Sequence, residues 1–245
     1  MSVSLSVAAK HGHVASQAAL SSQAALSSQA ALSSMSWATS AALENRDGLD
    51  LNGVVMHFNA DRPIYVEGDE ARSFYKVVTG VVRTCRFLSD GRRQIDAFHM
   101  TGEVFGFEAG ADHRMSAEAV SDCTVIAYRR RGLETMVAQD EGLGRWFFSH
   151  AMNCLAVARE HSLLLGRGSA AQKISAFLLE AAGREGTDGV VDLAMSRQDI
   201  ADYLGLTIET VSRTLSQLER DGTIKLPTAR RVVLKDRRAL KMLNS

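Results

Sequence analysis

Short runs of apolar and β-branched residues recur between residues 54 and 128, and turns rich in glycine and aspartate separate them. Such runs are typical of antiparallel strands. The pattern therefore predicts an all-β unit, an antiparallel sandwich or jelly-roll barrel, which we place at residues 48–138. Its strands are expected at 54–58, 64–66, 74–79, 81–87, 94–100 and 124–128.

From about residue 141 the apolar spacing becomes that of a long helix. One stripe recurs in steps of four and three from Leu143 to Leu164, like a coiled-coil seam, and a second stripe runs from Phe148 to Leu165. Two adjacent stripes suggest two burial partners, the β-unit for one and a second copy of the helix for the other. A single intramolecular helix with a broad buried face accounts for the pattern equally well.

Residues 196–221 are expected to form two short helices joined at a glycine. Ser196, followed three positions later by Asp199, is an N-cap with a capping-box-like acid. Gly205 breaks the first helix, and Thr207 caps a second one that ends near Arg220. Four positions fit the packing template of a DNA-reading helix-turn-helix: Ala201, Gly205, Leu206 and Val211.

The second of these helices carries an apolar and a polar stripe on neighbouring faces. The apolar stripe must face the protein, and the polar stripe is free to face a DNA groove. An ordinary amphipathic helix with a solvated face would show the same polar stripe, but it would not require the helix-turn-helix template. The apolar positions are Ile208, Val211, Leu215 and Leu218, and the polar ones are Glu209, Ser212, Arg213 and Ser216.

Three polar side chains on this helix suit direct contact with bases. Arg213 can donate two hydrogen bonds to a guanine, Glu209 can accept one from a cytosine or adenine amino group, and Ser212 can serve either kind of edge. We expect Thr207, Thr210 and Arg197 to contact the phosphate backbone.

The helix-turn-helix lies within a predicted C-terminal domain at residues 167–245. A helix capped by Ser169 runs through Ala182 before it, and two strands at 223–226 and 231–234 form a wing after it. Residues 1–47 differ from both domains. Ser and Ala supply 24 of the first 43 positions, and the hexad AALSSQ repeats without forming an apolar stripe. We interpret them as a low-complexity, largely disordered extension.

Composition and charge agree with a soluble, cytoplasmic protein. No apolar run approaches the length of a membrane span, and no signal peptide is recognisable. The formal net charge is zero, but residues 196–245 hold ten Lys and Arg against six Asp and Glu, whereas the first 195 residues hold 18 against 22. The C-terminal fifth is therefore the electropositive part of the chain.

The order β-unit, long helix, helix-turn-helix and wing resembles the CRP/FNR superfamily of bacterial transcription regulators, over residues 49–245. The motifs that carry the resemblance are Gly68-Asp69, Gly80, Gly102-Glu103-Val104-Phe105-Gly106 and Glu209-Thr210-Val211-Ser212-Arg213. The stretch IADYLGLTIETVSR is most similar to the FixK group, which regulates nitrogen-fixation and microaerobic genes. The resemblance implies an α+β fold: a cyclic-nucleotide-binding-like β-domain, a dimerisation helix at 139–166 and a winged helix-turn-helix. It also implies TTGAT-type half-sites.

Departures from the family patterns bear on any effector. Members that bind cyclic AMP use a Glu for the ribose and an Arg-Ser pair for the phosphate. Here Glu103 and Arg114 stand at comparable places, but Met115 follows the arginine. We interpret Glu103 and Arg114 as a residual effector pocket or, preferably, as a structural ion pair or turn. The iron-sulfur members need four thiolates. This chain has only three cysteines, Cys85, Cys123 and Cys154, so one chain cannot supply the four thiolates of such a cluster.

Cys154 lies on the first helical stripe, so in a dimer it could form a redox-sensitive bridge with its symmetry mate. A buried, inert thiol is the alternative that we prefer. Seven histidines show no convincing metal spacing. The sequence therefore indicates no metal and no cofactor.

The sequence thus predicts a DNA-binding regulator, not an enzyme. It would bind a pseudo-palindrome in double-stranded DNA as a homodimer, act with RNA polymerase, most simply as an activator, and need no small molecule. One alternative is a regulator of the same fold gated by a cyclic nucleotide or haem. A remote one is a cupin-type metalloenzyme, for which His57, His99 and His113 offer no cluster. Ser196 is expected close to the DNA backbone, where an oxidised or negatively charged group would oppose binding.

Replacing Arg213 with alanine removes the predicted contact to guanine. The loss should be about 1 to 3 kcal/mol on the specific site and much less on random DNA. A gel-shift series on both kinds of duplex measures the difference, and equal losses on the two would refute a base-reading role.

Overall fold

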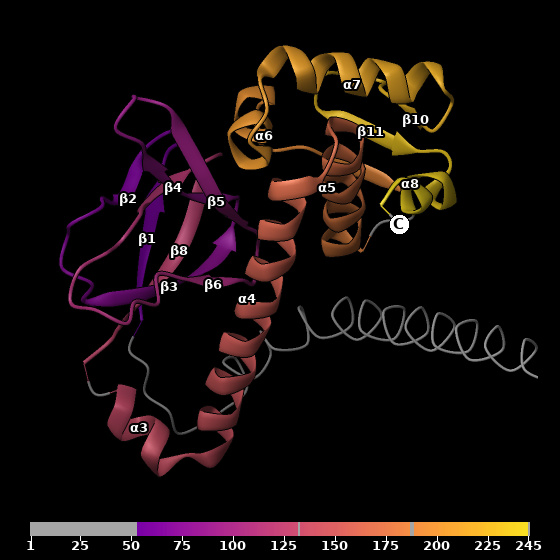
Figure 1. Ribbon diagram of the computed structural model, residues 1–245. Helices are drawn as coiled ribbons and strands as arrows, with labels where there is room; N and C mark the ends of the chain where they lie inside the picture. Colours follow the sequence, from indigo (N-terminus) through magenta and orange to yellow (C-terminus); the bar gives the residue numbers. More distant parts are fainter. Residues whose placement is uncertain (1–52, 132, 187–188, 245) are drawn as a thin grey trace, which may run out of the picture.

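The structure is a computed structural model that describes residues 53–131, 133–186 and 189–244. The predicted low-complexity extension at residues 1–47 lies outside them. Figure 1 shows a β-domain on one side, a long helix along it, and a smaller helical domain that packs against the upper part of both.

Two four-stranded antiparallel sheets face each other in the β-domain. One has the order β1-β8-β3-β6 and the other β2-β7-β4-β5. All six predicted strands are present, with boundaries within one residue of the expected ones. The strands are β1 Val54–Phe58, β2 Pro63–Tyr65, β3 Ser73–Thr79, β4 Val82–Phe87, β5 Arg93–His99, β6 Val104–Phe105, β7 Ser116–Ala119 and β8 Cys123–Arg129.

The core of the β-domain lies between the sheets, where alternate residues of each strand point inward. Val77, Val82 and Val125 are fully buried there. Gly80 makes the close approach between β3 and β8 possible. It has φ +83°, and a Cβ atom on it would lie 2.4 Å from the carbonyl oxygen of Asp122. Only glycine fits this turn without moving the strands.

Two short helices and three short strands escaped the sequence pattern. β6 has only two residues, and β7 has the sequence SAEA, which lacks the β-branched and aromatic residues typical of strands. β9, Val190–Asp192, precedes the helix-turn-helix. The helices are α3, Leu133–Gln139, and α8, Arg237–Leu243.

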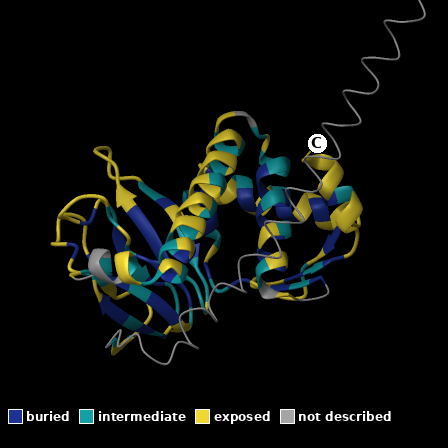
Figure 2. Cartoon of the chain, turned by 90° about the horizontal axis from the view of Figure 1, so that it is seen from below, coloured by how far each residue is buried: buried dark blue, intermediate teal, exposed yellow. Residues whose placement is uncertain are grey.

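The long helix α4 spans Glu141–Arg167, and the side chain of Asp140 caps it by accepting hydrogen bonds from the amides of Gly142 and Leu143. The first predicted stripe faces the rest of the chain at both ends: Leu143 is buried, and the ring of His161 stacks on Tyr203 at 4.2 Å. Most of the second stripe is exposed, as is Val157 in the middle of the first. Figure 2 shows this exposed face along much of α4.

The C-terminal domain consists of α5, Ala170–Glu185, then β9, the helix pair α6 and α7, and the wing. Ser169 and Gln172 form a reciprocal capping box at the start of α5. The wing is not the expected two-stranded ribbon. β10, Ile224–Lys225, and β11, Arg231–Leu234, are joined by β9 in a three-stranded sheet of order β10-β11-β9. β9 was missed because it has only three residues and lies far from the wing in sequence.

Candidate nucleic-acid interface

α6, Arg197–Leu204, and α7, Ile208–Arg220, form the predicted helix-turn-helix. Ala201 is fully buried at their crossing, and Val211 is fully buried in the angle between them. Gly205 ends α6 in the left-handed conformation, with φ 60°. Close packing of these residues fixes the angle between the two helices. A larger side chain at Ala201 would push the helices apart.

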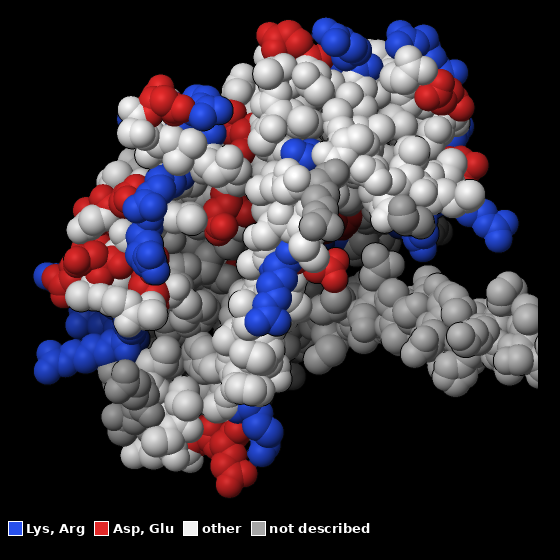
Figure 3. All heavy atoms as spheres, in the orientation of Figure 1, with Lys and Arg blue, Asp and Glu red and all other residues white. Residues whose placement is uncertain are grey.

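The polar stripe of α7 is open to solvent. Glu209, Ser212, Arg213 and Ser216 are all exposed, whereas Leu215 and Leu218 are buried beneath the helix. Figure 1 shows α7 on the outer surface, on the side away from α3 and the lower part of the β-domain. Figure 3 shows basic and acidic side chains gathered along this edge.

Ile208 departs from the expected arrangement. The sequence pattern assigned it to the buried stripe, but its side chain is 38% exposed. It is the first residue of α7, and it is much less covered than Val211 and Leu215 on the same side of the helix. The exposure of this apolar side chain, next to the polar stripe of α7, could not be predicted from the periodicity of the sequence.

The two threonines at the start of α7 are hydrogen-bonded to each other. Thr207 Oγ1 accepts from the amide of Thr210 at 3.2 Å and lies 3.1 Å from the hydroxyl of Thr210. Both hydroxyls are on the exposed side of the protein. Backbone N–H donation at the helix start and the Thr207 hydroxyl lower the pKa of Glu209. Glu209 is therefore ionised at neutral pH and accepts hydrogen bonds only.

Ser196 and Asp199 form the predicted capping box at the start of α6. The Ser196 hydroxyl accepts from the Asp199 amide at 3.1 Å, and the Asp199 carboxylate accepts from the Ser196 amide at 2.9 Å. Ser196 remains exposed. The exposed end of α6 therefore presents backbone N–H groups and a positive dipole end, which favour a phosphate.

Arg197 points to the wing. Its guanidinium donates from Nη2 to the carbonyl oxygen of Ala229 at 3.0 Å, and its Nη1 is buried without a hydrogen-bond partner. Burial lowers the pKa of Arg197. In the same turn, Thr228 Oγ1 accepts from the amides of Arg230 and Arg231 at 3.3 and 3.0 Å. Arg197 thus braces the wing turn.

The two residues of the expected residual effector pocket are separate. Glu103 accepts from the amide of Met100 at 3.1 Å and pairs with Arg184 of α5 at 3.4 Å. Arg114 is exposed, and its amide donates to Glu108 Oε1 at 3.0 Å. Within the part of the chain that the structure describes, no hydrogen bond or ion pair joins Glu103 to Arg114.

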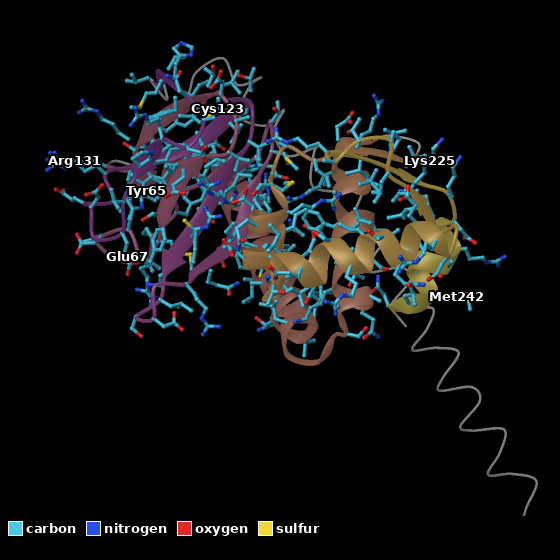
Figure 4. All side chains as sticks on the ribbon, turned by 90° about the horizontal axis from the view of Figure 1, so that it is seen from above. Tyr65, Glu67, Cys123, Arg131, Lys225 and Met242 are labelled. Carbon is cyan, nitrogen blue, oxygen red and sulfur yellow. The ribbon has the colours of Figure 1, made fainter. Side chains whose placement is uncertain are left out.

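Aromatic rings fill the neighbouring interior of the β-domain. Tyr65 stacks on the buried ring of His113 with centroids 3.6 Å apart, and it lies 5.5 Å from Tyr75 and 6.3 Å from Phe105. Burial lowers the pKa of His113 and raises that of Tyr65 well above its usual value. Both rings are therefore neutral near pH 7. Figure 4 shows Tyr65 within the β-domain, on the opposite side of the molecule from Lys225 in the wing.

Cys154 is exposed, so our preference for a buried thiol was wrong. It follows His150 by one helical turn, and its sulfur lies 3.5 Å from Nε2 of that ring. Partial burial of the sulfur, together with the charges of Glu103 and Asp96, raises the pKa of the Cys154 thiol. The higher pKa reduces the thiolate fraction on which oxidation depends. Among the described residues, no three His, Cys, Asp or Glu side chains are grouped to hold a metal ion.

Two family descriptions match the chain. Residues 55–140 match "Cyclic nucleotide-binding domain", and residues 172–243 match "Crp-like helix-turn-helix domain". The nitrogen fixation regulation protein FixK of Azorhizobium caulinodans is 48% identical over 193 residues, which are 77% of this chain and 78% of that protein. The chain belongs to the CRP/FNR family. It is a DNA-binding transcription regulator of the FixK type.

Other members support the same placement. The protein of the same name from Rhizobium meliloti is 42% identical, over 78% of this chain and 87% of that protein. The structure of FixK2 from Bradyrhizobium japonicum is 44% identical, with a TM-score of 0.76, and the match covers 79% of this chain and 98% of that one. No helix among the described residues is long and apolar enough to cross a membrane.

A carboxylate at position 196 should weaken DNA binding without unfolding α6. Aspartate caps a helix about as well as serine, but in Ser196→Asp it would face both the Asp199 carboxylate and the DNA phosphates. We expect a loss of about tenfold or more in affinity. Ser196→Asn is the matched control, since it is an equally good cap without charge. Fluorescence anisotropy on one duplex compares them, and full affinity in the aspartate variant would contradict this placement of Ser196.

Proposed function

We propose that the protein binds DNA as a homodimer and reads an inverted repeat of TTGAT-like half-sites without a small-molecule effector. One observation carries the proposal: a single chain leaves two complementary surfaces open, the polar row of α7 and an apolar row on α4. The first suits the edges of bases, and the second suits an identical helix. Either surface alone also occurs in proteins of unrelated function, but their combination is typical of a symmetric DNA reader.

The apolar row on α4 consists of large side chains that the single chain leaves in water. Phe148 and Leu163 are each 68% exposed, and Leu155 lies between them with a large exposed fraction. Pairing two such helices about a two-fold axis would remove these side chains from water, at roughly 25 cal/mol per Å² of apolar area. The two α7 helices would then face successive major-groove segments about 34 Å apart.

Within each half-site, we propose that Glu209, Ser212 and Arg213 read base edges. Arg213 suits the guanine of TTGAT, because its two donors match O6 and N7. Ile208 joins them as a fourth reading residue. Its exposed apolar side chain suits the methyl group of a thymine, which is an apolar group in the major groove.

Phosphate contacts would come from the exposed cap of α6 at Ser196 and from Thr207 and Thr210 at the start of α7. Arg197 would contribute through the wing turn that it braces. These contacts position the protein on the duplex and carry no sequence information themselves.

We infer effector-free binding from the filled interior of the β-domain. The Tyr65–His113 stack and the Glu103–Arg184 pair occupy groups that a nucleotide would otherwise need. The names of the FixK relatives support a role in nitrogen-fixation gene control. We further propose that the protein acts in low-oxygen gene control, as an activator that works with RNA polymerase. Titration calorimetry with cyclic nucleotides should show no heat of binding, and binding that alters DNA affinity would favour a ligand-gated protein.

A charge in the apolar row of α4 should separate the dimer. Phe148→Glu or Leu155→Glu would place two carboxylates against each other across the two-fold axis, where desolvation and repulsion oppose association. Sedimentation velocity should show a dimer for the wild type and a monomer for either variant, with loss of palindrome binding. Glu160→Gln changes an exposed residue of the same helix and serves as the control. A variant that stayed dimeric would show that α4 is not the interface.

The role of Ile208 can be tested on the DNA instead of the protein. Uracil in place of the first or second thymine of each half-site removes only the methyl group, and the loss in affinity should be a few-fold for the wild type. In Ile208→Ala the same DNA change should have no further effect, because the contact between the side chain and the methyl group is already absent and cannot be removed a second time. Additive losses in this cycle would contradict the contact.

A further inference from the structure

An ion-pair cluster joins the β4–β5 hairpin to α6, across more than 100 positions of sequence. Arg83 donates from Nη1 to Asp199 Oδ1 at 3.1 Å, and Arg93 donates from Nε to Asp202 Oδ2 at 2.8 Å. Arg93 also donates from Nη2 to Asp199. The side chains of Arg83 and Asp199 are only 8% and 6% exposed. We call this set, Arg83, Arg93, Asp199 and Asp202, the interdomain cluster.

The cluster acts on the capped end of α6. Oδ2 of Asp199 accepts from the amide and hydroxyl of Ser196, at 2.9 and 2.7 Å, while Oδ1 accepts from the two arginines. One carboxylate therefore connects the exposed helix end, where we place a DNA phosphate, to the β-domain. A hydrogen bond to a charged group is stronger and more directional than a neutral one.

The arginines are held on the β-domain side as well. Arg83 Nε donates to Glu118 at 2.9 Å and Arg83 Nη2 to Asp61 at 3.2 Å, and Glu118 belongs to the neighbouring strand β7. The β-domain therefore holds Arg83 independently of its contact with α6. An arginine with its geometry already set loses little side-chain entropy when it binds a carboxylate.

Apolar contacts beside the cluster supply attraction without fixing an angle. Phe98 of β5 lies 5.3 Å from the ring of Tyr203 and 6.4 Å from that of Phe177. Arg184 of α5 adds a second polar contact, donating to the carbonyl oxygen of Phe98 at 2.9 Å. Apolar burial is non-directional. The ion pairs and this hydrogen bond therefore set the orientation of the C-terminal domain.

We propose that Arg83 and Arg93 are positioning residues that lock the DNA-reading head onto the β-domain in the orientation that fits two half-sites at once. The proposal rests on the dimeric DNA reader described above. With the cluster formed, Ser196 and the polar row of α7 remain exposed, so docking leaves the reading surface free. The protein's own ion pairs thereby hold both heads in a competent arrangement without a ligand.

The expected loss in DNA affinity depends on the fraction of molecules whose C-terminal domain has the binding-competent orientation. When a binding-competent orientation falls to a fraction of the molecules, the apparent affinity falls by the same fraction. A palindrome requires both heads to be oriented together, whereas an isolated half-site requires only one head in any orientation. Loosening the cluster should therefore weaken binding to the palindrome and hardly affect binding to a half-site.

Arg93→Gln is the primary test variant, because it removes both contacts to α6 and leaves Arg83 paired. Its affinity should fall about tenfold or more on the palindrome and less than about twofold on a single half-site. Palindromes with one base pair added or removed between half-sites should be bound nearly as well as the correct spacing, which the wild type should prefer strongly. Arg93→Lys, which keeps the charge, should recover part of the loss.

Two further variants guard against simple damage to the fold. Asp202→Asn removes one contact from the opposite side, and its effect should not add to that of Arg93→Gln, since the two residues act through each other. Arg92→Gln is the matched control, because Arg92 is exposed and pairs with Asp90 in its own turn. Thermal unfolding monitors folding in each case.

The outcomes separate the two proposals. A wild type with no preference for two correctly spaced half-sites would overturn the dimeric reading itself. A wild type with that preference, joined to variants that keep it, would overturn the positioning role alone. Equal losses on palindrome and half-site would show general damage, and a gain in affinity would show that the cluster restrains binding; either result overturns the positioning role.

Discussion

The close packing of α6 against α7 is the constraint on which the rest of the molecule depends. Ala201 and Val211 are fully buried at the contact, and Gly205 turns the chain between the helices in a conformation that costs other residues energy. This packing turns the polar row of α7 outward. The wing sheet, α5 and the β4–β5 hairpin all pack around the same helix pair and support it.

The arrangement of the two larger parts adds a second level of control. A helix-turn-helix can face a groove wherever it is held, but a dimer reads two half-sites only if both heads are held at one angle. In the proposed dimer, the long helix α4 would set their distance, and the contacts of α5 and α6 with the β-domain would set their tilt. In this chain those contacts combine edge-on and tilted aromatic rings with buried ion pairs, which we propose hold the orientation without a ligand.

Much of this could be predicted from the sequence. The helix boundaries at Ser196, Gly205 and Thr207 were readable because caps and turns use few residue types. The strands with clear alternation were found, whereas β7 and β9 were missed because they are short and derive their stability from partners distant in sequence. The exposure of Ile208 was not predicted, because periodicity does not show where the underlying core ends.

The interdomain cluster and the direction of Arg197 could not be predicted, since each depends on a partner that the fold alone brings close. We propose that this chain reads a two-fold symmetric site by itself. Selection of bound sequences from random duplex DNA, with the purified, reduced, ligand-free protein, is the test. We expect enrichment of two inverted TTGAT-like half-sites with centres about one helical turn apart. Enrichment of a single unpaired motif, or of none, would contradict it.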